Sequence, residues 1–161
     1  MIPRKDRNIQ QGEQTMDYTI RFARIDDRDW IFALKSESIR PYVEKIWGWD
    51  ENYQKSDFAR DFSEIEQFRI IEMNGNCAGF IQCSFDDPYY EVVEIHLFEE
   101  YRGKGIGSDL LKNLQKFCVA QGKKVRIGCF KENRGAKRLY EKLGFIQTKE
   151  TDTHYIMEYK K

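Results

Sequence analysis

The sequence has no net charge, few histidines and no long hydrophobic run. Lys and Arg together number 27, as do Asp and Glu, so no overall field favours nucleic acid or an anionic membrane as partner. The two histidines, His96 and His154, are too few and too far apart to suggest a zinc site. No apolar stretch reaches transmembrane length, and the first residues lack the apolar core of a signal peptide. We therefore expect no metal, no nucleic acid and no membrane partner, and a cytoplasmic location.

The chain is also poor in cysteine but rich in aromatic residues. Its four cysteines are scattered without a CxxC pair, which is typical of reduced, mostly buried thiols. Aromatic residues make up 14% of the 161 residues, which excludes a disordered chain and is enough for one core. Residues 1–15 are polar and aperiodic, and Met16 resembles a fresh start. We predict a single domain over residues 16–161, preceded over 1–15 by a disordered extension or a remnant of expression.

The first part of the domain is predicted to contain one strand and two helices. Residues 18–25 alternate polar and apolar side chains, as a half-buried strand does. Asp26 or Asp27 can cap the helix that follows, because a short acidic side chain accepts hydrogen bonds from free N–H groups. Pro41 suits the start of a second helical segment, Gly48 interrupts it, and a further helix is expected to about Phe62.

The second part is predicted to form a hairpin followed by further strands and helices. The two apolar runs of residues 68–85 meet at an Asn-Gly turn, the strongest short signal for a hairpin. The remaining strands are predicted over 89–98, 125–130, 145–150 and 154–159, and the helices over 105–122 and 133–145. This order fits a mixed α/β sandwich with one central sheet flanked by helices.

Three glycines stand within five residues where the strand over 89–98 gives way to a helix. Gly103, Gly105 and Gly107 leave the main chain bare, and Arg102 and Lys104 add positive charge. Such a turn binds anions, because N–H groups converge on it and the helix dipole adds about half a positive charge. The spacing matches neither the GxxxxGK[ST] of a P-loop nor the GxGxxG of dinucleotide-binding folds. The turn therefore predicts a phosphate site of another kind.

Two motifs in this region resemble those of the Gcn5-related N-acetyltransferases, the GNAT superfamily. Residues 102–107 match [R/Q]-x-x-G-x-[G/A], and residues 132–145 match N-x-x-A-x-x-x-Y-x-x-x-G-F after a strand. The order of elements from Tyr18 onward is also similar to that of the family, so the resemblance covers nearly the whole chain. One departure is Glu99, where many members carry proline, and it should soften the entrance to the turn without abolishing binding.

The resemblance implies a fold and a co-substrate. The fold is α/β (α+β), with a mixed, mostly antiparallel sheet of about seven strands, about four helices and a splayed parallel pair at 91–98 and 125–130. Acetyl-CoA would lie between the splayed strands, its pantetheine arm along the strand end and beside an asparagine, and its pyrophosphate on the glycine turn. The residues assigned to these contacts by resemblance are Leu97, Phe98, Arg102, Gly103, Lys104, Gly105, Ile106, Gly107, Ser108 and Asn133.

The resemblance further implies transfer of an acetyl group from acetyl-CoA to a primary amine by direct attack in a ternary complex. Tyr140 would face the thioester sulfur and protonate the leaving thiolate, although helical spacing also fits a core position. Glu91, in preference to Glu94, would accept the proton of the amine, and a water molecule is the remaining alternative. Strict alternation puts Glu91 on one face with Ile95 and Glu94 on the other with His96, whereas a bulge would change that parity.

The acceptor and the oligomeric state are left open by the sequence. By resemblance, residues 39–53 shape the acceptor site, and their aromatic and acidic side chains suit a cationic amine, either a small molecule or a peptide. Monomer and homodimer both fit. A non-catalytic acyl-CoA-binding or sensor protein is the alternative function. Tyr140 and a strand glutamate favour catalysis, because a pure binding module needs neither.

Overall fold

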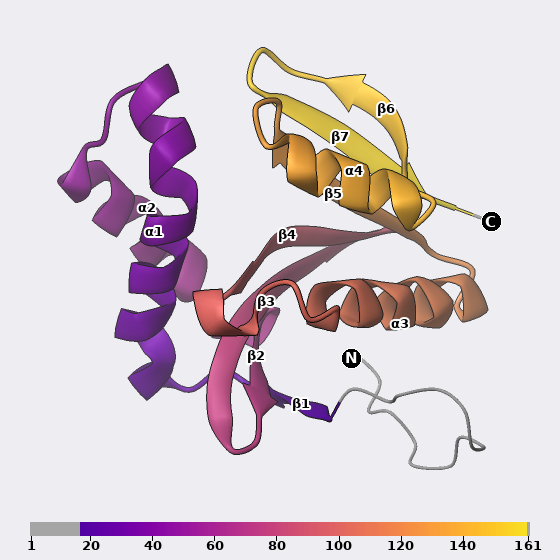
Figure 1. The fold of residues 1–161 in the computed structure, drawn as a ribbon, viewed down its shortest axis with the longest axis horizontal. Helices are drawn as coiled ribbons and strands as arrows, with labels where there is room; N and C mark the ends of the chain where they lie inside the picture. Colours follow the sequence, from indigo (N-terminus) through magenta and orange to yellow (C-terminus); the bar gives the residue numbers. More distant parts are fainter. Residues whose placement is uncertain (1–16, 161) are drawn as a thin grey trace.

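The computed structural model describes residues 17–160 and contains one seven-stranded sheet with four α-helices (Figure 1). The predicted extension over 1–15 lies outside the described residues. The strands are β1 (Tyr18–Phe22), β2 (Phe68–Met73), β3 (Asn76–Asp86), β4 (Tyr89–Leu97), β5 (Lys124–Phe130), β6 (Ile146–Glu150) and β7 (His154–Tyr159). The helices are α1 (Arg28–Ile46), α2 (Glu51–Phe62), α3 (Ile106–Ala120) and α4 (Arg134–Lys142). The spatial order is β1-β2-β3-β4-β5-β7-β6, and only β4 and β5 pair in parallel. The predicted fold class is confirmed.

Helices cover both faces of the sheet, and each face has its own core. On one face α1 and α2 bury apolar side chains such as Ile31 and Phe58 against Phe80 of β3. On the other face α3 and α4 close a second core, in which Leu110 packs with Val125 of β5. Figure 1 shows α1 and α2 standing apart from α3 and α4, on either side of the central strands. Within residues 17–160 no helix combines the length and the apolar character needed to cross a membrane.

Helix α1 differs from the prediction in its length. It continues through Pro41, which was expected to begin a new segment, and ends only at Ile46. A proline inside a helix removes one backbone hydrogen bond. The residues just after it are held by tertiary contacts, since Val43 is buried and the Tyr42 ring stacks on Phe130 at 5.0 Å between centroids. This packing carries α1 past the proline and across to β5.

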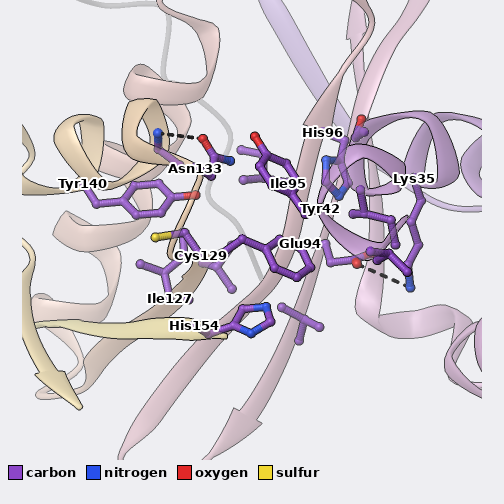
Figure 2. Close-up of a pocket in the computed structure, with 18 of the residues that line it drawn as sticks. Lys35, Tyr42, Glu94, Ile95, His96, Ile127, Cys129, Asn133, Tyr140 and His154 are labelled. Atoms are coloured by element: carbon purple, nitrogen blue, oxygen red, sulfur yellow. Dashed lines mark hydrogen bonds and ion pairs between the residues drawn. The ribbon is translucent and has the colours of Figure 1, made fainter. Parts of the chain in front are cut away.

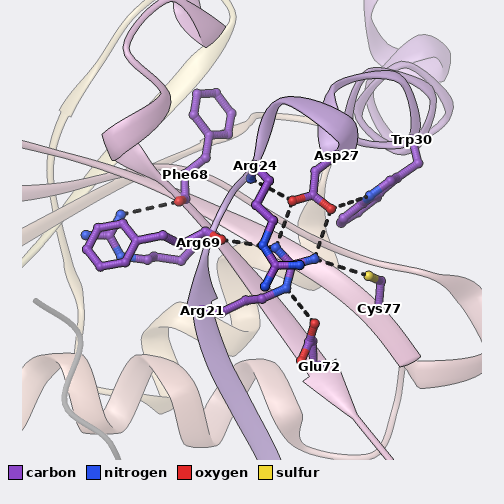
Figure 3. Close-up of polar contacts among 9 residues, drawn as sticks. Arg21, Arg24, Asp27, Trp30, Phe68, Arg69, Glu72 and Cys77 are labelled. Carbon is purple, nitrogen blue, oxygen red and sulfur yellow. Dashed lines mark hydrogen bonds and ion pairs between the residues drawn. The ribbon is translucent and has the colours of Figure 1, made fainter. Parts of the chain in front are cut away.

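The turn between β1 and α1 is organised around Asp27 (Figure 3). Its carboxylate accepts two hydrogen bonds from the guanidinium of Arg21, at 2.8 and 2.9 Å, and one each from the Arg24 N–H and the Trp30 indole. Arg21 also pairs with Glu72 of β2. Asp27 occupies the cap position of α1 but, unlike the predicted cap, its side chain makes no capping bond to the helix. The buried carboxylate instead joins α1 to β1, and Arg21 extends this link to β2.

Asp27→Asn is expected to destabilise the fold in a pH-dependent way. The Arg21 guanidinium lowers the pKa of the Asp27 carboxyl to about 2, against an unfolded value of about 3.9. A depressed carboxyl pKa stabilises the fold above the unfolded value, and that contribution is lost as pH falls from about 4 to about 2. Urea unfolding at pH 7 should show a loss of about 2 kcal/mol, which shrinks as the pH falls below 4. The control is Asp26→Asn, since Asp26 is exposed; an equal loss in both variants would contradict this account.

Strands β4 and β5 diverge, as the predicted splayed pair requires. They pair only over Tyr89–Val92 and Lys124–Ile127, so the later residues of both strands face a gap in the sheet. The cleft described below begins at this gap.

A bulge in β4 sets the direction of its glutamates. Val92 pairs with Cys83 while Glu94 pairs with the preceding Gln82, so one extra residue of β4 lies between them. Glu91 and Glu94 consequently face the same side of the sheet, because their partners Ser84 and Gln82 are two residues apart on β3. The bulge that the sequence left open as an alternative is therefore present, and strict alternation, which put Glu91 on the opposite face from Glu94, is wrong. The inserted residue reverses the parity once.

Candidate functional site

A cleft of about 1010 Å³ opens where β4 and β5 separate (Figure 2). Its wall on one side comes from α1, α2 and the loop between them, and on the other from α4 and the start of α3. The floor consists of the diverging ends of β4 and β5 together with β7. The predicted site residues that line the cleft are Glu91, Glu94, Leu97, Arg102, Gly107, Asn133 and Tyr140.

The glycine turn leaves main-chain N–H groups open at the start of α3. Gly103 and Gly105 have φ of 71° and 83°, a left-handed conformation that favours glycine. Gly105 caps α3 without a side-chain hydrogen bond, so the first N–H groups of the helix have no partner within residues 17–160. A Cβ built on Gly103 or Gly107 meets no atom within 4 Å. The turn therefore offers donors and free space, which fits a diphosphate.

At the end of β4 the backbone N–H of Leu97 is available to a ligand, whereas that of Phe98 is not. The Phe98 N–H donates to the Ala78 carbonyl at 2.9 Å and its carbonyl accepts from Tyr101, so both of its backbone groups are already used. The Leu97 N–H points away from β3, since backbone groups alternate along a strand, and β5 has already separated there. The Leu97 carbonyl accepts from Arg102 at 2.8 Å. Leu97 thus presents the free strand edge on which an extended amide can add.

Helix α4 presents Asn133 and Tyr140 to the cleft. Asn133 is the N-cap, and its side-chain oxygen accepts from the Ala136 N–H at 3.1 Å. Its side-chain nitrogen has no hydrogen-bond partner among the described residues and remains available as a donor. Tyr140 is buried, and its ring packs edge-on against Phe145 at 5.8 Å between centroids. Burial, with a smaller effect of Cys129, raises the Tyr140 pKa well above its ordinary value. The hydroxyl therefore keeps its proton at neutral pH.

The two β4 glutamates have different surroundings. Glu91 pairs with Arg126 at 2.5 Å, and about a quarter of each side chain is exposed. Glu94 is largely buried, and the Nζ of Lys35 lies 3.4 Å from its Oε1. Its Oε2 has no hydrogen-bond partner in the described part of the chain. Burial raises the Glu94 pKa to about 6, although Lys35 acts in the opposite direction. Glu94 thus has an unoccupied oxygen and a pKa just below neutrality.

Other predicted residues lie beside the cleft without lining it. The Ile106 side chain is fully buried under α3, so only its backbone can serve a ligand. Phe98 packs on Trp30 at 5.6 Å between ring centroids. The remaining members of this group are Gly103, Lys104, Gly105 and Ser108, which the turn holds next to Gly107.

The acceptor end of the cleft is only partly as predicted. Tyr42, Trp47 and Asp50 line it, whereas Trp49 and Glu51 bond to each other at 2.7 Å instead of lining it.

The structure adds residues that the sequence did not single out for this site. His96 lines the cleft, and burial above all, followed by the charges of Lys35 and Arg102, lowers its pKa to about 4. His154 also lines the cleft, and its ring lies tilted against that of Phe130 at 4.2 Å between centroids. Lys35 also lines the cleft, four residues after the buried Ile31. The sequence signal that could have identified Lys35 is its spacing, since a lysine four residues after a core isoleucine lies on the buried face of an amphipathic helix.

Comparison with known proteins agrees with this arrangement. The family model described as "Acetyltransferase (GNAT) family" matches residues 22–145. An uncharacterized N-acetyltransferase from Methanocaldococcus jannaschii is 32% identical over 139 residues, which are 80% of this chain but only 60% of that protein. The crystal structure of PaiA N-acetyltransferase from Thermoplasma acidophilum in complex with coenzyme A has a TM-score of 0.72 at 24% identity, covering 91% of this chain and 100% of that one. An N-acetyltransferase from Staphylococcus aureus has a TM-score of 0.69 at 19% identity, covering 88% and 100%.

Proposed function

The chain belongs to the GNAT family of acetyltransferases, and we propose that it transfers the acetyl group of acetyl-CoA to a primary amine by direct attack in a ternary complex. The observation that carries this proposal is the composition of the cleft. One end has the glycine turn with its open N–H groups, and the middle has Glu94 from β4 and Tyr140 from α4 on opposite sides (Figure 2). A pure binding protein needs the first feature but not the second.

The residues present fit acetyl-CoA as co-substrate. The N–H groups at the start of α3 would bind its diphosphate, and the side chains of Arg102 and Lys104 add positive charge beside them. The free edge at Leu97 and the amide of Asn133 would take the pantetheine amides. When bound there, acetyl-CoA supplies the activated acetyl thioester.

The chain's own residues would then move two protons. An alkylamine has a pKa near 10, so it must lose a proton before it can attack. Glu94 would accept that proton through its unpartnered oxygen, because its pKa of about 6 leaves it ionised at neutral pH. Tyr140 would donate its proton to the leaving thiolate. Holding both reactants in one cleft supplies much of the remaining rate.

The acceptor end favours a cationic amine. Trp47 and Tyr53 line the cleft with exposed rings, and Asp50 and Asp57 lie in the same wall. Aromatic faces and carboxylates both attract an ammonium group. We accordingly propose a small-molecule or peptide amine as acceptor.

The test of this function is thiol release from acetyl-CoA across a panel of amines. The panel contains diamines, amino acid amides, aminoglycosides and peptides with free N-termini. Amine-dependent release, with the acetylated amine identified by mass spectrometry, supports the proposal. Tight binding of coenzyme A without turnover on any amine would favour the alternative, a non-catalytic acyl-CoA-binding or sensor protein.

Gly107→Val is expected to abolish coenzyme A binding while leaving the fold intact. The backbone of Gly107 has an ordinary φ and open space at its Cβ, so valine fits the free protein but fills the position of the diphosphate. Valine also suits a helix better than glycine does. Calorimetry should show Kd raised at least about 100-fold, and saturating ligand should no longer give the roughly 2.7 kcal/mol of stabilisation expected at 100 times Kd. The matched control is Ala120→Val, at the exposed far end of the same helix; unchanged affinity in the Gly107 variant would contradict the site.

A further inference from the structure

Lys35 is a buried cation in the wall of the cleft. Only 8% of its side chain is exposed, and it comes from the middle of α1, with the Phe58 ring at 5.9 Å. Taking an ammonium group out of water is costly unless charged partners compensate. Lys35 has two carboxylates nearby, Glu94 at 3.4 Å and Asp61 at 3.7 Å. These carboxylates compensate the charge, but apolar packing would be achieved at lower cost by an apolar side chain. Packing alone therefore does not explain a lysine at this position.

The geometry at Glu94 supplies an explanation. Lys35 Nζ lies beside one oxygen, Oε1, and the other oxygen, Oε2, is buried and has no partner among the described residues. Figure 2 shows Lys35 reaching Glu94 from the side of the cleft away from Tyr140. The ammonium can therefore hold the carboxylate without standing between Glu94 and the reacting end of the cleft.

We propose that Lys35 is a positioning residue, whose ammonium holds Glu94 by one oxygen and leaves the other oxygen to accept the proton of the acceptor amine. This inference rests on the proposed function, in which Glu94 is the base. Burial raises the Glu94 pKa, and the ion pair with Lys35 lowers it again, so the carboxyl stays ionised near neutral pH.

The charges around Glu94 allow this role to be tested in two directions. From α1 it faces Lys35 and from α2 Asp57 and Asp61, and its own strand places Glu91 and His96 on the same face. Asp57 is paired with Arg60 at the surface, at 3.0 Å. The opposite charge on Lys35 lowers the Glu94 pKa, and the like charges on α2 raise it. Removal of Lys35 and removal of Asp61 should consequently shift the Glu94 pKa in opposite directions.

The experiment measures the Glu94 carboxyl directly in the ligand-free protein, by 13C NMR titration of glutamate-labelled chain with Glu94→Gln for assignment. Lys35→Met, which keeps the length of the side chain, should raise the Glu94 pKa by about 1 to 2 units. Lys35→Arg should leave it near the wild-type value, and Asp61→Asn should lower it. In the amine assay the acidic limb of kcat/KM should follow the same shifts, so that Lys35→Met loses about tenfold at pH 6.5. At pH 9, where Glu94 is ionised in both proteins, kcat of Lys35→Met should stay about tenfold below the wild type, because the carboxylate is no longer held in place.

A Lys35 that only stabilises the fold would change the melting temperature and, through its charge, the Glu94 pKa, but Lys35→Met would then regain wild-type kcat at pH 9. An unshifted Glu94 pKa in folded Lys35→Met overturns the inference, and so does an Asp61→Asn variant in which that pKa does not fall. The second variant keeps the test decisive if Lys35→Met does not fold. If the predicted NMR shifts are found but the protein acetylates no amine, the proposed function is overturned and the interaction of Lys35 with Glu94 is retained. If the protein acetylates an amine but the Glu94 pKa does not shift in Lys35→Met, the proposed function is retained and the role of Lys35 is overturned.

Discussion

Glu94→Gln is expected to lower kcat/KM by about 10²- to 10⁴-fold, the range for a positioned proton acceptor. Glutamine has the shape of glutamate, but its amide cannot take a proton from the amine. The acidic limb of the rate profile, which reports Glu94 with its pKa near 6, should disappear in the variant. Affinity for coenzyme A should remain close to that of the wild type, because the glycine turn is untouched.

Glu91→Gln is the matched control for this loss. Both glutamates lie on the same face of β4 and line the cleft, but Glu91 is paired with Arg126 and more exposed. We expect its removal to change kcat/KM by less than about tenfold. A larger loss in Glu91→Gln than in Glu94→Gln would move the base to Glu91. Equal, small losses would point to water as the proton acceptor.

The ends of the β2–β3 hairpin and of helices α3 and α4 could be predicted from the sequence to within a few residues. Local signals are strong there: the Asn-Gly turn between β2 and β3, the glycines before α3 and the asparagine cap of α4 each fix the backbone within a few residues. The length of α1 could not be predicted in this way. Pro41 is a local stop signal, and the contacts that override it, Tyr42 on Phe130 and the burial of Val43, join residues far apart in the sequence.

The orientation of the site residues depends on long-range geometry to an even greater degree. Period-two reasoning separated Glu91 from Glu94, and only the pairing of β4 with β3 reveals the extra residue that puts them on one face. Lys35 belongs to α1 and Glu94 to β4, and no spacing rule connects them. Motifs therefore identify the half of the cleft that we propose for coenzyme A, because the contacts proposed there are mostly with the backbone. The proton-accepting half depends on which elements pack together.

Tyr140→Phe is expected to lower turnover by about 10²- to 10⁴-fold, because it removes the hydroxyl and keeps the ring. The ring would still pack on Phe145, so the fold and the affinity for coenzyme A should be nearly unchanged. The Tyr140 pKa is raised by burial, so the phenol stays protonated and the wild-type rate should be flat from about pH 7 to pH 9. Single-turnover measurements are needed so that product release does not hide the chemical step.

Tyr159→Phe is the control that separates this role from packing. Tyr159 also contacts Phe145, at 5.9 Å between centroids, but it does not line the cleft. If Tyr140 only packs the core, the two variants should behave alike and keep wild-type turnover. If its hydroxyl protonates the leaving thiolate, only Tyr140→Phe should be slow, and an acceptor-independent defect should remain across the whole amine panel. A substrate with a more acidic leaving thiol should recover part of the rate, since a better leaving group needs less help from a donor.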